Sequence, residues 1–136
     1  MTATPQTTRE VVDAFFARFA AGDLTGLLDL FADRVDFLVP GAPNVPWTGA
    51  RSGREQIAEF FAVLGTALTP AQEFTIDATI VEDGHAVVTG RSRFGVLSTG
   101  RSFLNEFALH FTVADGRIIG YRMHEDSHAI SAAFAA

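Results

Sequence analysis

Residues 73–125, EFTIDATIVEDGHAVVTGRSRFGVLSTGRSFLNEFALHFTVADGRIIGYRMHE, decide the fold. Apolar and polar residues alternate along four runs, and the runs are separated by the pairs Asp83-Gly84, Thr99-Gly100 and Asp115-Gly116. Glycine-containing turns between alternating runs are typical of β-hairpins. The stretch therefore predicts four successive antiparallel strands, at about residues 73–82, 85–97, 101–113 and 117–125.

Upstream of these strands the sequence is mainly helical. Thr7 and Glu10 fit a capping box ahead of an apolar stripe at helical spacing, and Gly22 is placed to end that helix. Ser52 and Glu55 fit a second capping box. The expected order is a helix at about 7–22, a short helix at 23–31, a strand at 34–39, a proline-rich loop at 40–49 and a helix at 52–66. A further helix is expected over 127–136.

This element order predicts the α+β class, because helices segregated from an antiparallel sheet define it. A long sheet must curl to bury its apolar face, so we expect a cone-like curved antiparallel sheet with three helices packed on its concave side. The open end of such a cone would form a pocket. We expect one domain over residues 1–136, with residues 1–6 frayed.

Composition excludes several classes of function. The net charge is −6 and all ten basic residues are arginine, so neither a basic nucleic-acid footprint nor lysine chemistry is expected. Cysteine is absent, no apolar run approaches the roughly 18 residues of a membrane helix, and no signal pattern opens the chain. We therefore expect a cytoplasmic protein with no membrane or nucleic-acid partner. The thirteen phenylalanines fit either a dry core or a pocket for an apolar ligand.

Short segments in a fixed order connect the chain with a known superfamily: Phe19-Ala-Ala-Gly-Asp23, Leu30-Phe-Ala-Asp33, Val45-Pro-Trp-Thr-Gly49, Ser52-Gly-Arg-Glu-Gln-Ile57, Thr99-Gly-Arg101 and Asp115-Gly-Arg-Ile118. With these segments the chain resembles the nuclear transport factor two-like superfamily, in its SnoaL-like and ketosteroid isomerase-related branch. The resemblance implies a cystatin-like α+β barrel. It also implies a pocket for a small hydrophobic ring-containing molecule and pairing of two subunits through the sheet.

The residues that carry the chemistry of similar enzymes are replaced here. Where ketosteroid isomerases place a tyrosine and two aspartates, this chain has Phe15, Val39 and Ala108. The epoxide hydrolase positions fall on Phe37, Val39 and Met123. None of these side chains can move a proton, so the resemblance predicts the fold without predicting the reaction.

Strand periodicity suggests other candidates for acid–base chemistry. If Ala108 faces the pocket, Glu106 and His110 face it too, and on the last strand Tyr121 and Glu125 share a face with each other. Glu106 is the first catalytic candidate, because apolar neighbours raise the pKa of a carboxyl group, and His110 or Glu125 could assist. A β-bulge could reverse the faces, and an ion pair between Glu106 and an arginine is the alternative.

The expected ligand-binding wall is mostly aromatic: Phe15, Phe19, Phe37, Val39, Trp47, Phe60, Phe94, Ala108, Tyr121 and Met123. Trp47 lies in the proline-rich loop, where it could act as a lid at the pocket mouth or pack over the rim. The expected function is cofactor-free acid–base chemistry of the isomerase, cyclase, dehydratase or hydrolase type. A non-catalytic small-molecule binding protein is the alternative, because the same wall would serve it.

Residues His124-Glu-Asp-Ser-His128 match the zinc protease motif H-E-x-x-H. That motif works when both histidines lie on one helix, whereas here the first histidine ends a predicted strand. We therefore expect no metal site, and we expect Asp126 or Ser127 to cap the terminal helix.

A homodimer is expected through the outer face of the sheet. On one choice of strand parity Phe103, Leu109 and Ile119 point outward, and such an apolar surface is unfavourable in open solvent.

Overall fold

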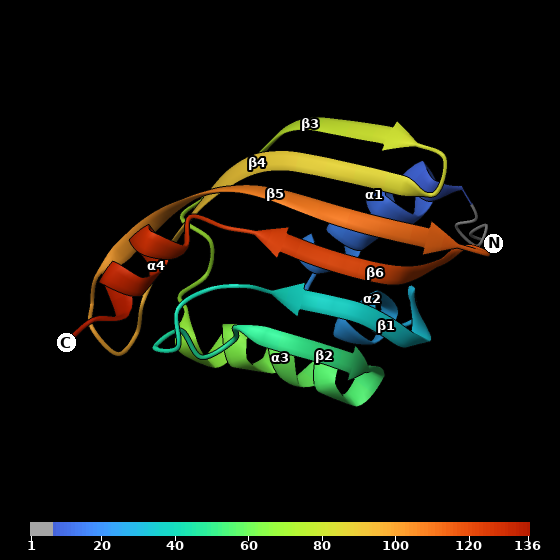
Figure 1. Cartoon of the computed structure of the whole chain (residues 1–136). Coiled ribbons are helices and arrows are strands. Elements are labelled where there is room, and N and C mark those ends of the chain that lie inside the picture. The colour runs from blue at the N-terminus through green and yellow to red at the C-terminus, as the bar shows by residue number, and fades with distance from the viewer. Residues whose placement is uncertain (1–6) are drawn as a thin grey trace.

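The computed structural model describes residues 7–136, which form a curved six-stranded sheet and four helices (Figure 1). The α+β class is therefore confirmed, whereas the expected fraying of residues 1–6 lies outside the described residues. The elements are α1 (Thr8–Ala20), α2 (Leu24–Leu28), β1 (Phe31–Val39), β2 (Gly49–Gly53), α3 (Arg54–Ala67), β3 (Glu73–Glu82), β4 (His85–Gly95), β5 (Ser102–Ala114), β6 (Arg117–His124) and α4 (Ser127–Phe134).

The strands lie in the order β2-β1-β6-β5-β4-β3. The predicted four-strand meander is confirmed, because β3, β4, β5 and β6 pair antiparallel in succession. The sheet as a whole is mixed, however, since β1 pairs parallel with β6. β2 was not predicted, because its residues lack apolar alternation, and it forms by pairing with the edge of β1.

The turns of the meander have the backbone geometry that their residues favour. Asp115 and Gly116 have φ of 52° and 72°, and Asp83 also has φ of 52°. A two-residue hairpin turn of type I′ needs positive φ at both central positions, which aspartate and glycine tolerate. Asp115 and Gly116 meet this requirement in the β5–β6 hairpin, whereas in the β3–β4 turn only Asp83 has positive φ.

Helix capping follows the sequence at three termini and departs from it at one. Thr7 and Glu10 form the expected capping box, with both hydrogen bonds at 3.1 Å. The expected capping box before α3 is wrong. Gly53 is the N-cap of α3 and makes no side-chain cap, while the Gln56 side chain accepts a hydrogen bond from the Ser52 backbone instead. Asp23 caps α2 and Asp126 caps α4 through their side chains, as expected.

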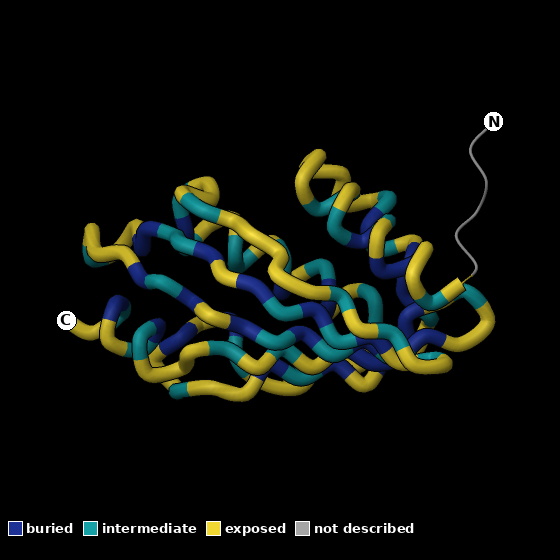
Figure 2. The backbone as a smooth tube through the Cα atoms, turned by 90° about the horizontal axis from the view of Figure 1, so that it is seen from above, coloured by how far each residue is buried: buried dark blue, intermediate teal, exposed yellow. Residues whose placement is uncertain are grey.

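The core lies between the inner, concave face of the sheet and the helices α1, α2 and α3. Buried positions recur along the strands (Figure 2). Phe15 of α1 packs its ring at 5.0 Å from Phe111 of β5 and at 5.9 Å from Tyr121 of β6. Within residues 7–136, no helix combines the length and the apolar character needed to cross a membrane.

Candidate functional site

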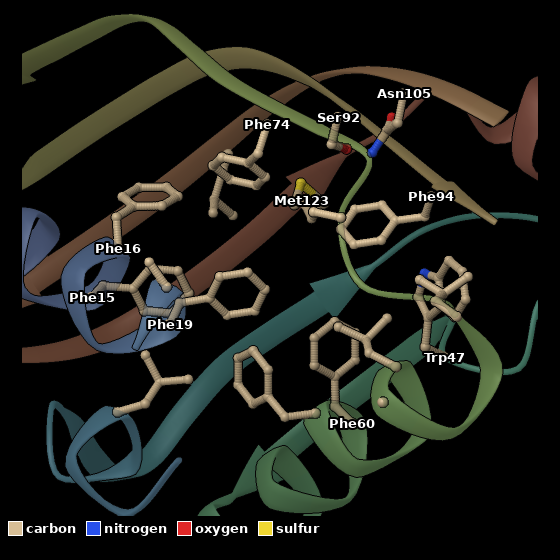
Figure 3. A pocket seen from close by; sticks show the side chains of 18 of the residues that line it. Phe15, Phe16, Phe19, Trp47, Phe60, Phe74, Ser92, Phe94, Asn105 and Met123 are labelled. Atoms are coloured by element: carbon tan, nitrogen blue, oxygen red, sulfur yellow. The ribbon is translucent and has the colours of Figure 1, made fainter. Parts of the chain in front are cut away.

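A cavity of about 690 Å³ lies between the inner face of the sheet and the helices. Aromatic and aliphatic side chains make up most of its wall (Figure 3), with Phe15 and Phe19 from α1 and Phe60 and Phe61 from α3. Cavities that bind small organic molecules are typically mostly apolar and roughly 300–1,000 Å³ in volume. The cavity therefore has the size and the chemistry of a small-molecule site.

The cavity has an open end and a closed end. Lining residues with exposed surface gather at the α1–α2 junction and around the segment between α3 and β3: Ala20, Gly22, Asp23, Leu24, Gly65, Pro70 and Ala71. At the other end Trp47, Ser92 and Asn105 are only 1%, 2% and 4% exposed. Trp47, expected at the mouth, thus lies at the closed end, where its ring packs 5.4 Å from that of Phe134 in α4.

Glu125 is the one acidic side chain at the closed end. It follows the last residue of β6, lines the cavity and is partly buried. The Trp47 Nε1–H donates a hydrogen bond to Glu125 Oε2 at 3.3 Å. Burial raises the pKa of Glu125 from 4.5 to about 7, and the hydrogen bond from Trp47 opposes this with a smaller effect. Near neutral pH the group therefore exists as both acid and carboxylate, so it can donate or accept a proton.

Tyr121 lines the cavity two residues before Met123 on the same face of β6. Its ring stacks parallel on Phe37 at 4.3 Å, which fixes its orientation. Burial, with a further contribution from Glu125, raises the pKa of Tyr121 well above its usual value. The hydroxyl therefore stays protonated and acts as a hydrogen-bond donor.

Sequence reasoning missed two polar residues of the wall. Ser92 of β4 and Asn105 of β5 are paired across neighbouring strands, and both project into the cavity (Figure 3). The signal that could have identified Asn105 is its place in the alternation Phe103, Asn105, Phe107, Leu109, where it is the one polar member.

The expected inward face of β5 is wrong. Glu106, Ala108 and His110 lie on the outer face of the sheet, and the intervening Phe107 and Leu109 are buried toward the cavity. The reason is energetic: turning the larger apolar side chains inward removes more apolar surface from water than turning Glu106, Ala108 and His110 inward would. Glu106 is exposed, so it is not the carboxyl group among apolar neighbours that the sequence predicted.

Other expected wall positions divide between the cavity and the solid core. Phe15, Phe19, Trp47, Phe60, Phe94, Tyr121 and Met123 line the cavity, and their binding of a ligand stays a prediction. Phe37 and Val39 are buried beside the wall in the core instead. Phe103 and Leu109, expected on the outer surface, also face the cavity, so that part of the expected dimer face is wrong.

A pair of histidines lies on the outer face. His85 Nδ1 and His110 Nε2 are 3.0 Å apart. The pKa of His110 is lowered, first by burial and then by the neighbouring His85, His124 and Arg122. His124 and His128 fall at the end of β6 and in α4, so the H-E-x-x-H residues do not share one helix. Residues 7–136 contain no group of three or more side chains arranged to hold a metal ion.

The comparisons with known proteins agree with this architecture. Residues 12–121 match the SnoaL-like domain family. The chain belongs to this family. No curated protein sequence gives a significant match.

Solved structures share the fold at low sequence identity. An NTF2-like protein from Burkholderia thailandensis E264 is 20% identical with a TM-score of 0.87, covering 96% of this chain and 99% of that one. TerC, co-crystallized with polyporic acid, is 22% identical with a TM-score of 0.83, covering 95% and 98%. A protein with a ketosteroid isomerase-like fold from Catenulispora acidiphila, in complex with trimethylamine, is 18% identical with a TM-score of 0.76, covering 93% of each chain. These likenesses show the fold alone.

Proposed function

We propose that this SnoaL-like protein binds a small hydrophobic, ring-containing molecule in its cavity and moves a proton to or from it through Glu125. The reaction would be of the isomerase, cyclase, dehydratase or hydrolase type and would need no cofactor. The observation that carries the proposal is one partly buried carboxyl group, with a pKa of about 7, at the closed end of an apolar cavity. The co-crystal of the similar TerC with polyporic acid supports the same class of ligand.

The surroundings of Glu125 suit proton transfer. The hydrogen bond from Trp47 holds Oε2, and Oε1 has no hydrogen-bond partner among residues 7–136. The Tyr121 hydroxyl, also without such a partner, is available to hold an oxygen of the bound molecule. A ligand seated against the rings of Phe60 and Phe94 would exclude water, which strengthens these polar contacts.

The test compares two glutamate-to-glutamine variants. Glu125→Gln removes the titratable group in the cavity, and Glu106→Gln makes the same change on the outer face. The probe is 2-tetralone, a ring ketone whose α-protons exchange with solvent deuterium, and exchange is followed by NMR. We expect wild type and Glu106→Gln to accelerate the exchange equally and Glu125→Gln to lose the acceleration by about 100-fold or more. Equal exchange rates in wild type and Glu125→Gln would show the proposal to be wrong.

A non-catalytic binding protein is the second candidate, favoured by a cavity wall that is mostly apolar. The same samples separate the two functions. Saturable binding of 2-tetralone, of an aromatic epoxide and of polyporic acid, with no chemical change in any of them, supports a binding protein. Chemical change that depends on Glu125 supports an enzyme.

We also propose that two copies pair through the outer face of the sheet. Ile80 of β3 is 62% exposed and lies opposite Val87 of β4 on that face. Leu38 and Leu104 add further apolar surface on β1 and β5. Sedimentation at micromolar concentration should show a dimer for wild type and a shift toward monomer for Ile80→Arg. A wild-type monomer would exclude this pairing.

A further inference from the structure

Two polar side chains occupy the apolar wall of the sheet at the closed end of the cavity. Ser92 is 2% exposed and Asn105 is 4% exposed, and they face each other across β4 and β5. Burying a polar group without a hydrogen bond costs roughly 1–3 kcal/mol. Because they lie among phenylalanine and leucine side chains, each of them needs a hydrogen-bond partner to offset this cost.

The orientation of the Asn105 amide is fixed. Its Oδ1 accepts a hydrogen bond from the backbone N–H of Asp126 at 2.9 Å, and a backbone N–H can only donate. Asp126 is itself held as the N-cap of α4 through its hydrogen bond from Ala129 N. The Nδ2 group of Asn105 must therefore point the other way, into the cavity (Figure 3).

Neither the Asn105 Nδ2 nor the Ser92 Oγ has a partner within residues 7–136. No fully buried side-chain nitrogen or oxygen of the described residues lacks a hydrogen-bond partner. The two groups consequently retain accessible surface, and since both residues line the cavity, that surface belongs to the cavity. The wall thus presents a rigid amide donor beside a hydroxyl that can donate or accept.

This polar pair is close to Glu125, because Asp126 both follows Glu125 and bonds to Asn105. The opposite end of the cavity, toward the mouth, is lined by Phe19, Leu24 and Phe74. A bound molecule consequently meets mostly apolar surface along its length, and it meets the Asn105 amide and the Ser92 hydroxyl where it reaches the closed end. The Glu125 carboxyl group beside the donors disfavours a carboxylate on the ligand, because like charges repel and both would be desolvated.

The geometry points to Asn105 and Ser92 as an oxygen-recognition site that orients the ligand. The ligand class is a neutral ring compound with a carbonyl oxygen at one end, which enters oxygen-first and accepts a hydrogen bond from Asn105 Nδ2. The aromatic wall holds the ring body behind it. This inference rests on the proposed function for the identity of the binding cavity, and it does not require Glu125 to be catalytic.

The test uses two probes of nearly equal shape, 2-acetylnaphthalene and 2-isopropenylnaphthalene, in which a methylene group replaces the carbonyl oxygen. Binding is measured by calorimetry on the full chain. We expect wild type to bind the ketone about tenfold more tightly than the alkene, as one well-placed hydrogen bond allows. Asn105→Asp keeps an oxygen for the Asp126 N–H. Measured at about pH 9, well above the ordinary carboxyl pKa, the ionised side chain has no donor, and the preference for the ketone should be abolished.

Equal affinities of the two probes for wild type, or a preference that survives in Asn105→Asp, would overturn the assignment. The carbonyl stretch of the bound ketone gives a second measurement on wild type, which does not depend on the folding of a variant. We expect it to shift to lower frequency than in an apolar solvent, and no shift would also overturn the assignment. A ketone preference that persists in Glu125→Gln, together with no turnover by wild type, would refute the catalytic proposal while supporting this one.

Discussion

Replacing Glu125 by glutamine should change how stability depends on pH. In wild type the pKa of Glu125 is 4.5 when the chain is unfolded and about 7 when it is folded. Between these values the folded protein keeps the proton and the unfolded chain has lost it, so the free energy of unfolding falls as pH rises through this window. Each tenfold change in proton affinity is worth about 1.4 kcal/mol, so the full effect is about 3 kcal/mol. Glutamine does not titrate, and it keeps an oxygen for the Trp47 N–H.

The assay is urea unfolding of wild type and Glu125→Gln from about pH 4.5 to about pH 7.5 at constant ionic strength, followed by the fluorescence of Trp47, the one tryptophan. We expect the stability of wild type relative to the variant to decrease by about 3 kcal/mol across this range, or about 10 °C in Tm. Glu106→Gln, measured in the same way, serves as the matched glutamate-to-glutamine change at an exposed site. Parallel curves for wild type and Glu125→Gln would refute the reasoning, because they would mean that folding does not desolvate the carboxyl group.

Three further changes test the fold and the outer face. Phe37→Ala should lower the free energy of unfolding by about 3–5 kcal/mol in urea titrations, because Phe37 is 1% exposed and stacks on Tyr121. A loss below about 1 kcal/mol would contradict this packing. Thr7→Ala should cost about 1 kcal/mol by the same measurement through loss of the α1 cap, with Thr7→Ser as a control that retains it. His85→Ala should raise the pKa of His110, measured by NMR titration, only part of the way to its usual value. Burial of His110 is the larger cause of the lowered pKa, and the substitution leaves that burial in place. An unchanged pKa would rule out the contact between His85 and His110.

The candidate site shows where sequence patterns succeed and fail. Alternation on the last strand put Tyr121 and Glu125 on the same face, and the structure has both in the cavity wall. Alternation on β5 predicts two faces as well, but it does not tell which face turns inward, and the prediction rested on Ala108 facing the pocket. The choice depends on total apolar area, which Phe107 and Leu109 dominate, and that comparison places Glu106 in solvent.

The sequence by itself determined the elements whose causes are local. Hairpin turns at Asp83 and Asp115, the capping box at Thr7 and the apolar periods are properties of a few neighbouring residues, so each could be read without the fold. Only the tertiary structure decided the parallel pairing of β1 with β6, the strand β2 and the closed end of the cavity. At that end Trp47 contacts Glu125, 78 residues further along the chain, and Asn105 contacts Asp126, 21 residues further along. The burial that raises the pKa of Glu125 therefore comes from elements that are far apart in the sequence.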